Sequence, residues 1–405
     1  MYADFSMKTN LSEKLIAMKK TDSIAFIFSG LYVGGAEKFG INLANKFVAD
    51  GIPTHLILFE NFKSPMFDQV DKRIEIIYIK RRHKLDIILN RQFEVEIGKR
   101  SINKVIFFCL SPLFLTRFMS FSRNKSVDYF ISLHSTIPSS FKTRVKNLIF
   151  FTLTRKSDTA LFICHNQREY HKKYYFFNPR LYDVIYNGVD IDYFKPGSGQ
   201  IIVNKREALK IGPMEKMILL VATIRPEKGH GFAIEALNIL HQKYSGKGNT
   251  HLVFTGDGLP EYITKLKQLV TKYNLGSYVH FEGNQKDVRA YYEVADIFTL
   301  TSSGETFSIA ALEAMCYGLP ISLTNIGGAA EMVVEGMNGN LSKTKDSASM
   351  AQSWAHLIDA GLDRQAIRVH TEKNYSLKLI FNQYKKVILS QPSVLQQATI
   401  STEKS

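Results

Sequence analysis

The chain has 405 residues, more than a single hydrophobic core usually organises, so two domains are expected. Hydrophobic residues make up 45% and charged residues 22% of the sequence, which is ordinary for a globular protein and argues against a disordered chain. The formal net charge is +15, and residues 1–200 contain 30 of the 52 Lys and Arg residues but 18 of the 37 Asp and Glu residues. This basic first half indicates an anionic partner, for which membrane lipid, an anionic acceptor and nucleic acid are candidates; a basic surface that serves solubility is the alternative.

The cysteines and the apolar segments bear on the cellular compartment. Cys109, Cys164 and Cys316 are too few and too scattered for a disulfide framework, and they lack the spacing of metal ligands. Residues 1–23 hold no continuous apolar core of the kind found in secretory signals. The most apolar stretch, Val105–Phe121, contains a proline and an arginine and is shorter than the roughly 20 residues of a spanning helix. We expect a cytoplasmic protein with buried, reduced cysteines; peripheral binding to the inner face of the cell membrane stays open.

In the first half, short apolar runs alternate with longer amphipathic stretches, the first of which is a helix pattern at residues 36–49. This alternation predicts a parallel sheet covered by helices on both faces. The runs of the buried-strand type are Ile24–Ser29, Thr54–Phe59, Ile74–Ile79, Lys104–Cys109, Asp128–Leu133 and Thr159–Cys164.

The alternation pauses at Phe194–Gln200, a segment rich in Pro and Gly, and then restarts. The second set of predicted strands is Met217–Ala222, His251–Gly256, Tyr278–Gly283, Asp296–Thr301 and Pro320–Thr324. We therefore predict an α/β protein with two doubly wound, Rossmann-like domains, residues 22–195 and 200–372, that face each other across a cleft. Residues 373–390 are predicted to form a C-terminal helix that packs back on the N-terminal domain.

The first motif, S-G-L-Y-V-G-G-A-E at Ser29–Glu37, ends the first strand and opens the first helix. Gly34 and Gly35 carry no side chains, so their backbone N–H groups can approach a ligand closely. The helix that follows places a positive dipole end at the same point. The motif favours an anion site, with a plain tight turn as the alternative.

The second motif, V-A-T-I-R-P-E-K-G-H at Val221–His230, ends the first strand of the second domain. Arg225 and Lys228 lie three residues apart in a loop that precedes a helix. A paired Arg and Lys would neutralise the two charges of a nucleoside diphosphate. A solvated basic loop is the alternative, but the position at a strand's carboxyl end favours binding.

The third motif, Thr301–Pro320, also follows a strand. Ser308 is a predicted N-cap, which makes the preceding loop an anion-binding helix start. Glu305 and Glu313 are eight residues apart, about 12 Å along a helix axis, so they cannot act together on one atom. Each carboxylate can accept hydrogen bonds from paired hydroxyls, and together they could hold the two ends of one extended ligand. Two solvated glutamates are the alternative.

Together, these motifs resemble those of the family 4 retaining glycosyltransferases of the GT-B fold, the glycosyl transferases group 1. The resemblance extends from about Ile24 to Tyr384. It includes the glycine loop, R-P-E-K-G within the second motif and the Glu-x7-Glu element of the third. The remaining matches are Asn187–Asp190, Gly256–Gly258 and Asn325–Glu331.

The resemblance implies a role for each part of the third motif. Glu305 would meet the hydroxyls of the donor sugar, and Glu313 would bind the ribose. The amides of Phe307, Ser308 and Ile309 would cap the distal phosphate. The second domain would accordingly bind the nucleotide sugar, and the first domain would bind the acceptor.

The other implied site residues lie in both domains. Arg225 and Lys228 would hold the diphosphate and stabilise its charge as it leaves. His134 matches a family position near the transferred sugar. The further donor-binding residues would be Gly34, Gly35, Gly256 and Asp257. Catalytic roles are thus expected for Glu305, His134, Arg225 and Lys228.

Two features concern the phosphate site. Many family members have an arginine five residues before the motif lysine, where this chain has Thr223, so the phosphate contact would depend on Arg225. No metal or other cofactor is expected, because cations and helix dipoles can stabilise the leaving group and no suitable Asp-x-Asp element is present.

Positive charge in the first domain is concentrated at Lys80–Lys84 and Phe141–Lys156. The second segment has apolar and basic residues suited to an amphipathic helix at a membrane surface. A helix that buries its apolar side in the core is an equally good interpretation.

The favoured function is transfer of a sugar from a nucleoside-diphosphate sugar, UDP-sugar before GDP-sugar, to a glycan or lipid-linked acceptor. The setting implied by the resemblance is surface polysaccharide or lipopolysaccharide biosynthesis. A nucleotide-sugar 2-epimerase on the same fold is one alternative. A basic nucleic-acid-binding protein is another, although no recognised nucleic-acid motif accompanies the charge, so nucleic acid is not the expected partner.

Overall fold

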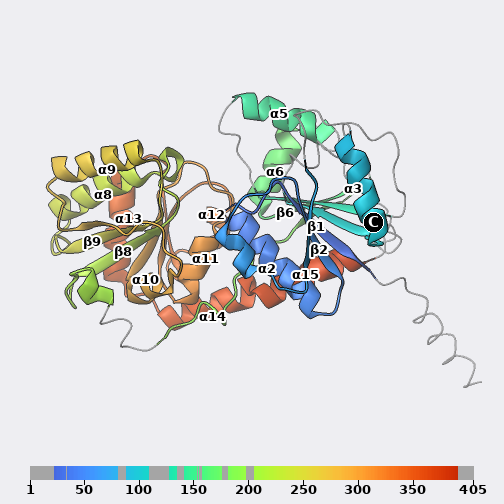
Figure 1. Cartoon of the computed structure of the whole chain (residues 1–405). Helices are drawn as coiled ribbons and strands as arrows, with labels where there is room; N and C mark the ends of the chain where they lie inside the picture. The colour runs from blue at the N-terminus through green and yellow to red at the C-terminus, as the bar shows by residue number, and fades with distance from the viewer. Residues whose placement is uncertain are drawn as a thin grey trace, which may run out of the picture.

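The structure is a computed structural model of the chain, and it describes residues 22–32, 34–80, 88–108, 127–134, 141–152, 154, 157–175, 181–197 and 205–390. Two α/β domains lie side by side, and the chain passes from one to the other after β7 and again between α14 and α15 (Figure 1). The paired strands of both sheets run parallel, which agrees with the predicted fold class.

The N-terminal domain has a seven-stranded sheet in the order β3-β2-β1-β4-β5-β6-β7. The strands are β1 (Ile24–Phe28), β2 (Thr54–Leu58), β3 (Glu75–Tyr78), β4 (Lys104–Phe107), β5 (Asp128–Leu133), β6 (Thr159–Phe162) and β7 (Leu181–Val184). The helices are α2 (Gly35–Ala49), the 3-10 turn η1 (Pro65–Gln69), α3 (Ile88–Lys99), α5 (Phe141–Thr152) and α6 (His165–Tyr174). The strands β1 and β4 are buried throughout, because helices cover both faces of the sheet.

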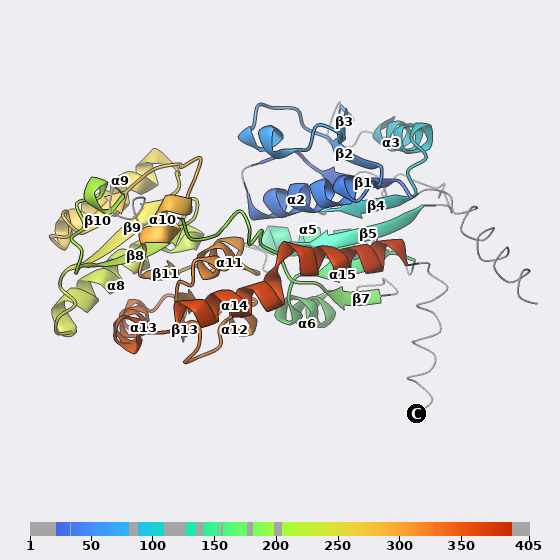
Figure 2. The same cartoon turned by 90° about the horizontal axis from the view of Figure 1, so that it is seen from below.

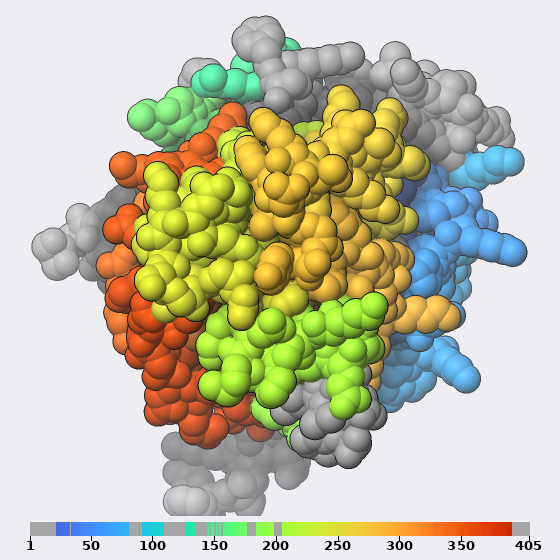
Figure 3. Space-filling view, turned by 90° about the vertical axis from the view of Figure 1, so that its left-hand side faces the viewer, coloured from blue at the N-terminus to red at the C-terminus, as the bar shows by residue number. Residues whose placement is uncertain are grey.

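The C-terminal domain has a six-stranded sheet in the order β10-β9-β8-β11-β12-β13. The strands are β8 (Lys216–Val221), β9 (Thr250–Thr255), β10 (Val279–Phe281), β11 (Ile297–Leu300), β12 (Ile321–Thr324) and β13 (Gly339–Ser342). The helices are η2 (Pro226–Lys228), α8 (His230–Lys243), α9 (Pro260–Lys272), α10 (Arg289–Val294), α11 (Ile309–Cys316), α12 (Ala329–Met332), α13 (Ser347–Ala360) and α14 (Arg364–Tyr375). The last helix, α15 (Leu377–Leu389), returns to the N-terminal domain. Helices α8 and α9 lie next to each other on the outer end of this domain, which faces the viewer in Figure 3.

In both sheets, the strand order reverses beside the domain's first strand. β1 lies between β2 and β4, and β8 lies between β9 and β11. In parallel α/β sheets, ligands bind outside the carboxyl ends of the strands at such a reversal. The loops that leave β1 and β8 are the first and second sequence motifs, so the topology places both at the expected binding positions.

The last two helices join the domains (Figure 2). α14 packs against α11 of the C-terminal domain, whereas α15 packs against α2 and contributes Phe381 and Tyr384 to the N-terminal core. Ser376 separates the two helices and accepts a hydrogen bond from Leu379 N at 3.4 Å, which begins α15. The segment after β7, where the chain first passes between the domains, lies beside the junction of α14 and α15. Val189 N donates to Tyr375 O at 2.9 Å, and Val189 O accepts a hydrogen bond from Leu377 N at 2.8 Å.

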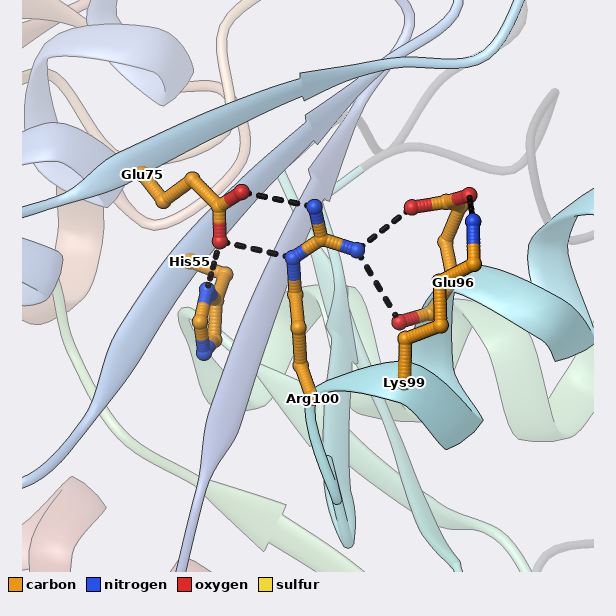
Figure 4. Close-up of polar contacts among 5 residues, drawn as sticks. All are labelled: His55, Glu75, Glu96, Lys99 and Arg100. Atoms are coloured by element: carbon orange, nitrogen blue, oxygen red, sulfur yellow. Dashed lines mark hydrogen bonds and ion pairs between the residues drawn. The ribbon is translucent and has the colours of Figure 1, made fainter.

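A network of ion pairs fastens α3 to the edge of the N-terminal sheet (Figure 4). The Arg100 guanidinium donates to both carboxylate oxygens of Glu75 on β3 at 2.6 Å, and also to Glu96 of α3. His55 Nδ1 lies 3.2 Å from the same Glu75 carboxylate. Hydrogen bonds from Arg100 hold the pKa of Glu75 below its usual value. None of these residues lines the cavity described below, so their role is structural.

The sequence predictions for the strands, the cysteines and the apolar segments can be compared with the structure. The strands β7 and β13 were not predicted; each has four residues and lies at a sheet edge. Cys164 and Cys316 are buried and have free thiols, while Cys109 lies outside the described residues. Among the described residues, no helix is long and apolar enough to cross a bilayer.

Candidate active site

A cavity of about 550 Å³ lies between the domains at the carboxyl ends of β1 and β8. Its size is within the range of small-molecule sites. All the predicted site residues except Arg225 line it: Gly34, Gly35, His134, Lys228, Gly256, Asp257, Glu305, Phe307, Ser308, Ile309 and Glu313. Residues more than 270 positions apart in the sequence therefore meet in one space.

Two helix N-termini, one from each domain, border this cavity. α2 begins after Gly34, an N-cap with no side chain of its own. α11 begins after Ser308, whose hydroxyl accepts a hydrogen bond from Ala311 N at 3.2 Å. A Cβ atom on Gly35 would lie 3.4 Å from Cδ1 of Ile309, so the two helix starts approach each other closely. Two positive dipole ends directed at one space suit a ligand with more than one negative charge.

Glu313 is the most buried charged residue of the cavity wall, with 4% of its surface exposed. Its Oε1 lies 2.5 Å from Lys38 Nζ, and its Oε2 accepts a hydrogen bond from Tyr292 OH at 2.9 Å. Lys38 belongs to α2 of the N-terminal domain, so this ion pair spans the cleft. The same ammonium also lies 4.8 Å from the centre of the Phe194 ring.

Glu305 is paired with Lys228 on the opposite loop, with Oε2 and Nζ 2.7 Å apart. The two loops are fastened together by their backbones, because Ser303 N donates to Glu227 O at 2.8 Å. The hydroxyl of Thr301 also donates to the carbonyl oxygens of Lys228 and Gly229. The carboxylate and the ammonium thus have fixed positions at the cavity wall.

His134 contributes a neutral imidazole to the N-terminal side of the cavity. Its ring stacks on Phe108 with centroids 5.1 Å apart, and its Nε2 lies 2.9 Å from Ser132 Oγ. Burial lowers the pKa of His134 to about 3. The ring is therefore uncharged near neutral pH and can serve as a hydrogen-bond partner for a neutral group.

The loop after β9 requires glycine. Gly256 has a φ of +137°, and a Cβ atom there would lie 2.0 Å from the carbonyl oxygen of Ala222. This close approach packs the loop against the end of β8, where Ile224 N also bonds to Asp257 O at 2.8 Å. Asp257 accepts a hydrogen bond from Gly258 N at 2.8 Å through its side chain. Gly256 and Asp257 thus shape the wall beside Lys228.

Arg225 is the one predicted site residue that the structure does not bring to the cavity. It is the exposed residue before η2, whereas Thr223, at the position of the family arginine, lines the cavity. In this arrangement Lys228, and not Arg225, supplies the positive charge of the second motif to the cavity.

Sequence reasoning missed several cavity residues. Lys38 lies one turn into α2, three residues after Gly35, and this position in the first motif was the signal that could have found it. The loop residues Asn284, Gln285 and Lys286 after β10 also line the cavity, but no pattern in the sequence marks them. Within the described parts of the chain, no group of three or more His, Cys, Asp or Glu residues is arranged to hold a metal ion.

Two family models match the chain in succession. The model described as Glycosyltransferase Family 4 matches residues 33–193, and Glycosyl transferases group 1 matches residues 202–374. Among curated proteins, the chain is 29% identical over 180 residues to the D-inositol 3-phosphate glycosyltransferase of Corynebacterium urealyticum, a match that covers 43% of this chain and 42% of that protein. It is 28% identical over 208 residues to the N-acetyl-alpha-D-glucosaminyl L-malate synthase of Bacillus anthracis, which covers 50% and 52%. The matched region therefore spans about half or less of these relatives.

Solved structures match over a larger part of the chain. HepE of Anabaena in complex with UDP has a TM-score of 0.79 at 20% identity, and covers 91% of this chain and 100% of that one. WaaG, a glycosyltransferase involved in lipopolysaccharide biosynthesis, has a TM-score of 0.70 at 18% identity, with 91% and 100% covered. These likenesses show the fold. Because the two family models match one domain each and in the expected order, the chain belongs to the family 4 glycosyltransferases of the GT-B fold.

Proposed function

We propose that the protein is a retaining glycosyltransferase that moves a sugar from a nucleoside-diphosphate sugar to a glycan or lipid-linked acceptor. The observation that carries the proposal is the meeting of two helix N-termini, Lys228 and two carboxylates in one interdomain cavity. A diphosphate fits the positive groups, and the hydroxyls of a sugar and a ribose fit the carboxylates. UDP is the favoured nucleotide because the structurally similar HepE was solved with UDP and with UDP-glucose; GDP remains the second choice.

Transfer breaks the bond between the anomeric carbon and the diphosphate oxygen and forms a bond from that carbon to an acceptor hydroxyl oxygen, whose proton passes to the leaving diphosphate. Negative charge therefore builds on the diphosphate as it leaves. Lys228 and the starts of α2 and α11 would stabilise that charge, so the proposal includes no metal ion. Glu313 would exchange its bond with Lys38 for bonds to the ribose hydroxyls, and Glu305 would bind hydroxyls of the donor sugar.

A donor screen tests the proposal. The thermal midpoint of the purified chain is measured with UDP-, GDP-, ADP- and dTDP-sugars in the presence of a metal chelator. A ligand at about 100 times its Kd stabilises the folded state by about 2.7 kcal/mol, so one nucleotide should raise the midpoint selectively. The shift should be lost in Glu313→Gln and retained in Glu261→Gln, an exposed glutamate of α9 outside the cavity.

The outcomes separate the candidate functions. No shift with any donor, together with no sugar-nucleotide consumption, would contradict the transferase proposal. Isomerisation of the nucleotide sugar without an acceptor would identify an epimerase instead. Salt-sensitive binding to arbitrary duplex DNA without nucleotide-sugar binding would identify a nucleic-acid-binding protein.

We further propose that the N-terminal domain binds the anionic inner face of the cell membrane through α5 and α6, in a pathway for surface polysaccharide or lipopolysaccharide. The described part of α5 buries Phe151 but exposes Val145, Leu148 and Ile149 by 40%, 37% and 47%. On α6, Tyr174 is 40% exposed, and Arg144 of α5 lies over its ring at 5.1 Å. Exposed apolar side chains beside cations suit a lipid interface. Of the basic segment at residues 80–84, only Lys80 is among the described residues.

Vesicle flotation tests this surface, with phosphatidylcholine vesicles that either contain or lack phosphatidylglycerol. The wild-type chain should float with the anionic vesicles, and the double variant Leu148→Glu with Ile149→Glu should not. Met214→Glu is the matched control, because Met214 is an apolar residue of the C-terminal domain that is 89% exposed. Equal flotation of all three proteins would contradict the role of α5.

A further inference from the structure

A buried chain of hydroxyl groups connects the C-terminal helix to the N-terminal side of the cavity. Tyr384 OH on α15 lies 3.1 Å from Ser132 Oγ on β5, and Ser132 Oγ lies 2.9 Å from His134 Nε2. Ser132 and Tyr384 are both fully buried, with no exposed surface. These three residues join two parts of the sequence that are about 250 residues apart, and only His134 among them reaches the cavity.

The direction of these hydrogen bonds follows from the number of protons available. If His134 Nε2 carried the ring proton, three protons, those of Nε2 and of the two hydroxyls, would share the two hydrogen bonds at Ser132 Oγ. One hydroxyl proton would then have no acceptor among the described residues: that of Tyr384 if Ser132 donates to Tyr384, or that of Ser132 if its oxygen accepts both bonds. An unsatisfied buried donor costs about 1–3 kcal/mol.

The opposite direction gives both buried hydroxyl protons an acceptor. Tyr384 donates to Ser132, Ser132 donates to His134 Nε2, and the ring proton then resides on Nδ1. In the part of the chain that the structure describes, His134 Nδ1 has no hydrogen-bond partner, while the residue lines the cavity. The N–H group is thereby left to donate to a ligand.

We propose that Tyr384 and Ser132 are positioning residues that fix His134 as the Nδ1–H tautomer, so that the imidazole donates a hydrogen bond to an oxygen of the bound sugar. The packing of the rings supports a fixed orientation as well. The ring of Phe108 stacks on that of His134 with centroids 5.1 Å apart. The centroid of the Phe39 ring lies 5.7 Å from those of both His134 and Tyr384. The return of α15 to the N-terminal domain would thus serve the site as well as the core.

The tautomer is measured directly in the ligand-free full-length chain. Histidine labelled with ¹⁵N gives different nitrogen shifts for protonated and unprotonated ring positions, and His134→Gln assigns the signal. The wild type should show a protonated Nδ1 and an unprotonated Nε2. Tyr384→Phe and Ser132→Ala should each give a mixture of tautomers or the Nε2–H form. A wild-type Nε2–H tautomer, or no change in either variant, would overturn the proposal.

Ser353→Ala is the matched control, because it removes another buried hydroxyl pair, with Ser322 Oγ at 2.7 Å, outside the cavity. It should leave the His134 signal unchanged. Tyr384→Phe keeps the aromatic ring and its packing, and Ser132→Ala provides a second variant in case one of the two fails to fold.

The kinetic consequence rests on the proposed function, whereas the tautomer does not. With a donor such as UDP-glucose, kcat of Tyr384→Phe should fall about 2- to 12-fold, the equivalent of one neutral hydrogen bond. KM for the donor should change little, because the nucleotide site lies on the C-terminal domain. A normal kcat with an altered tautomer would refute the link to transfer, and an inactive wild type would challenge the proposed function alone.

Discussion

The two domains share a topology but contribute different chemistry to the cavity. The C-terminal domain supplies Lys228, Glu305, Glu313 and the start of α11, all charged groups or dipoles in fixed positions. The N-terminal domain supplies a glycine loop with the start of α2, a neutral histidine and, among its described residues, one cation, Lys38. Under the proposed function, the charged nucleotide sugar requires particular residue types at defined places, which would account for the denser sequence motifs in the second half of the chain.

The largest expected effect tests the C-terminal site. Glu305→Gln and Glu313→Gln should each lower transfer by about 10²- to 10³-fold, since each removes a preorganised charge from the donor site. Initial rates of nucleotide release measure the loss, and circular dichroism checks the fold. Glu261→Gln should retain full activity. Full activity in both site variants would show that the C-terminal domain does not hold the donor in this way.

Acidification should destabilise both domains, since burial lowers the pKa of histidines in each. They include His55 in the N-terminal domain and His241, His251, His280 and His370 on the C-terminal side. Burial lowers the pKa of His134 to about 3 and that of His171 to about 4 in the N-terminal domain, and that of His230 to about 4 in the C-terminal domain. Between these values and the ordinary value near 6.5, the unfolded chain binds more protons than the folded one, so stability falls as the pH falls. Each histidine can contribute up to about 1.4 kcal/mol per pH unit in that range.

Urea unfolding between pH 7.5 and pH 4 at about half-unit steps measures this effect. The fluorescence of Trp354, the only tryptophan of the chain, reports on the C-terminal domain, and circular dichroism reports on both. Acid should lower both midpoints, and His171→Gln should reduce the acid shift of the dichroism signal while leaving that of the fluorescence signal unchanged. A midpoint that does not change with pH in either signal would contradict the buried, neutral state of the histidines that the signal reports.

Loss of the ion pair between Lys38 and Glu313, which joins the domains, should have a smaller effect than the changes above. Lys38→Met should destabilise the ligand-free protein by about 1–3 kcal/mol, because it leaves the buried carboxylate of Glu313 with Tyr292 as its one remaining described partner. A double-mutant cycle with Glu313→Gln isolates the coupling between the two. Additive effects would indicate that the pair does not link the domains.

The smallest effect concerns a second contact between the domains. The carboxylate of Glu331 accepts hydrogen bonds from His165 N and Asn166 N at 2.8 and 2.7 Å, and so caps α6 from the opposite domain. Glu331→Ala should cost about 0.5–2 kcal/mol, as removal of a helix cap does. It should also alter the domain separation in small-angle X-ray scattering.

Asp363→Ala is the matched control for that cap, because Asp363 accepts two backbone N–H bonds within its own helix, α14. It should reduce stability by a similar amount without a change in scattering. If both variants changed the scattering alike, Glu331 would have no special part in holding the domains.

The sequence by itself determined the elements with strong local signals. Apolar runs of four to six residues marked most of the strands, and the three motifs marked the loops that leave β1, β8 and β11. The spacing of Glu305 and Glu313 separated their roles, and the structure gives them different partners, Lys228 and Lys38. These features depend on residues close together in the chain, which is why they can be read from it.

Only the tertiary structure decided which residues share the cavity. It brought Lys38 to Glu313 and left Arg225 outside, because both placements depend on how one loop or domain packs against another. It also placed Tyr384 beneath His134, since α15 returns across the domain boundary to complete the N-terminal core. Contacts between segments about 250 residues apart leave no periodic pattern in either segment, so the sequence alone could not reveal them.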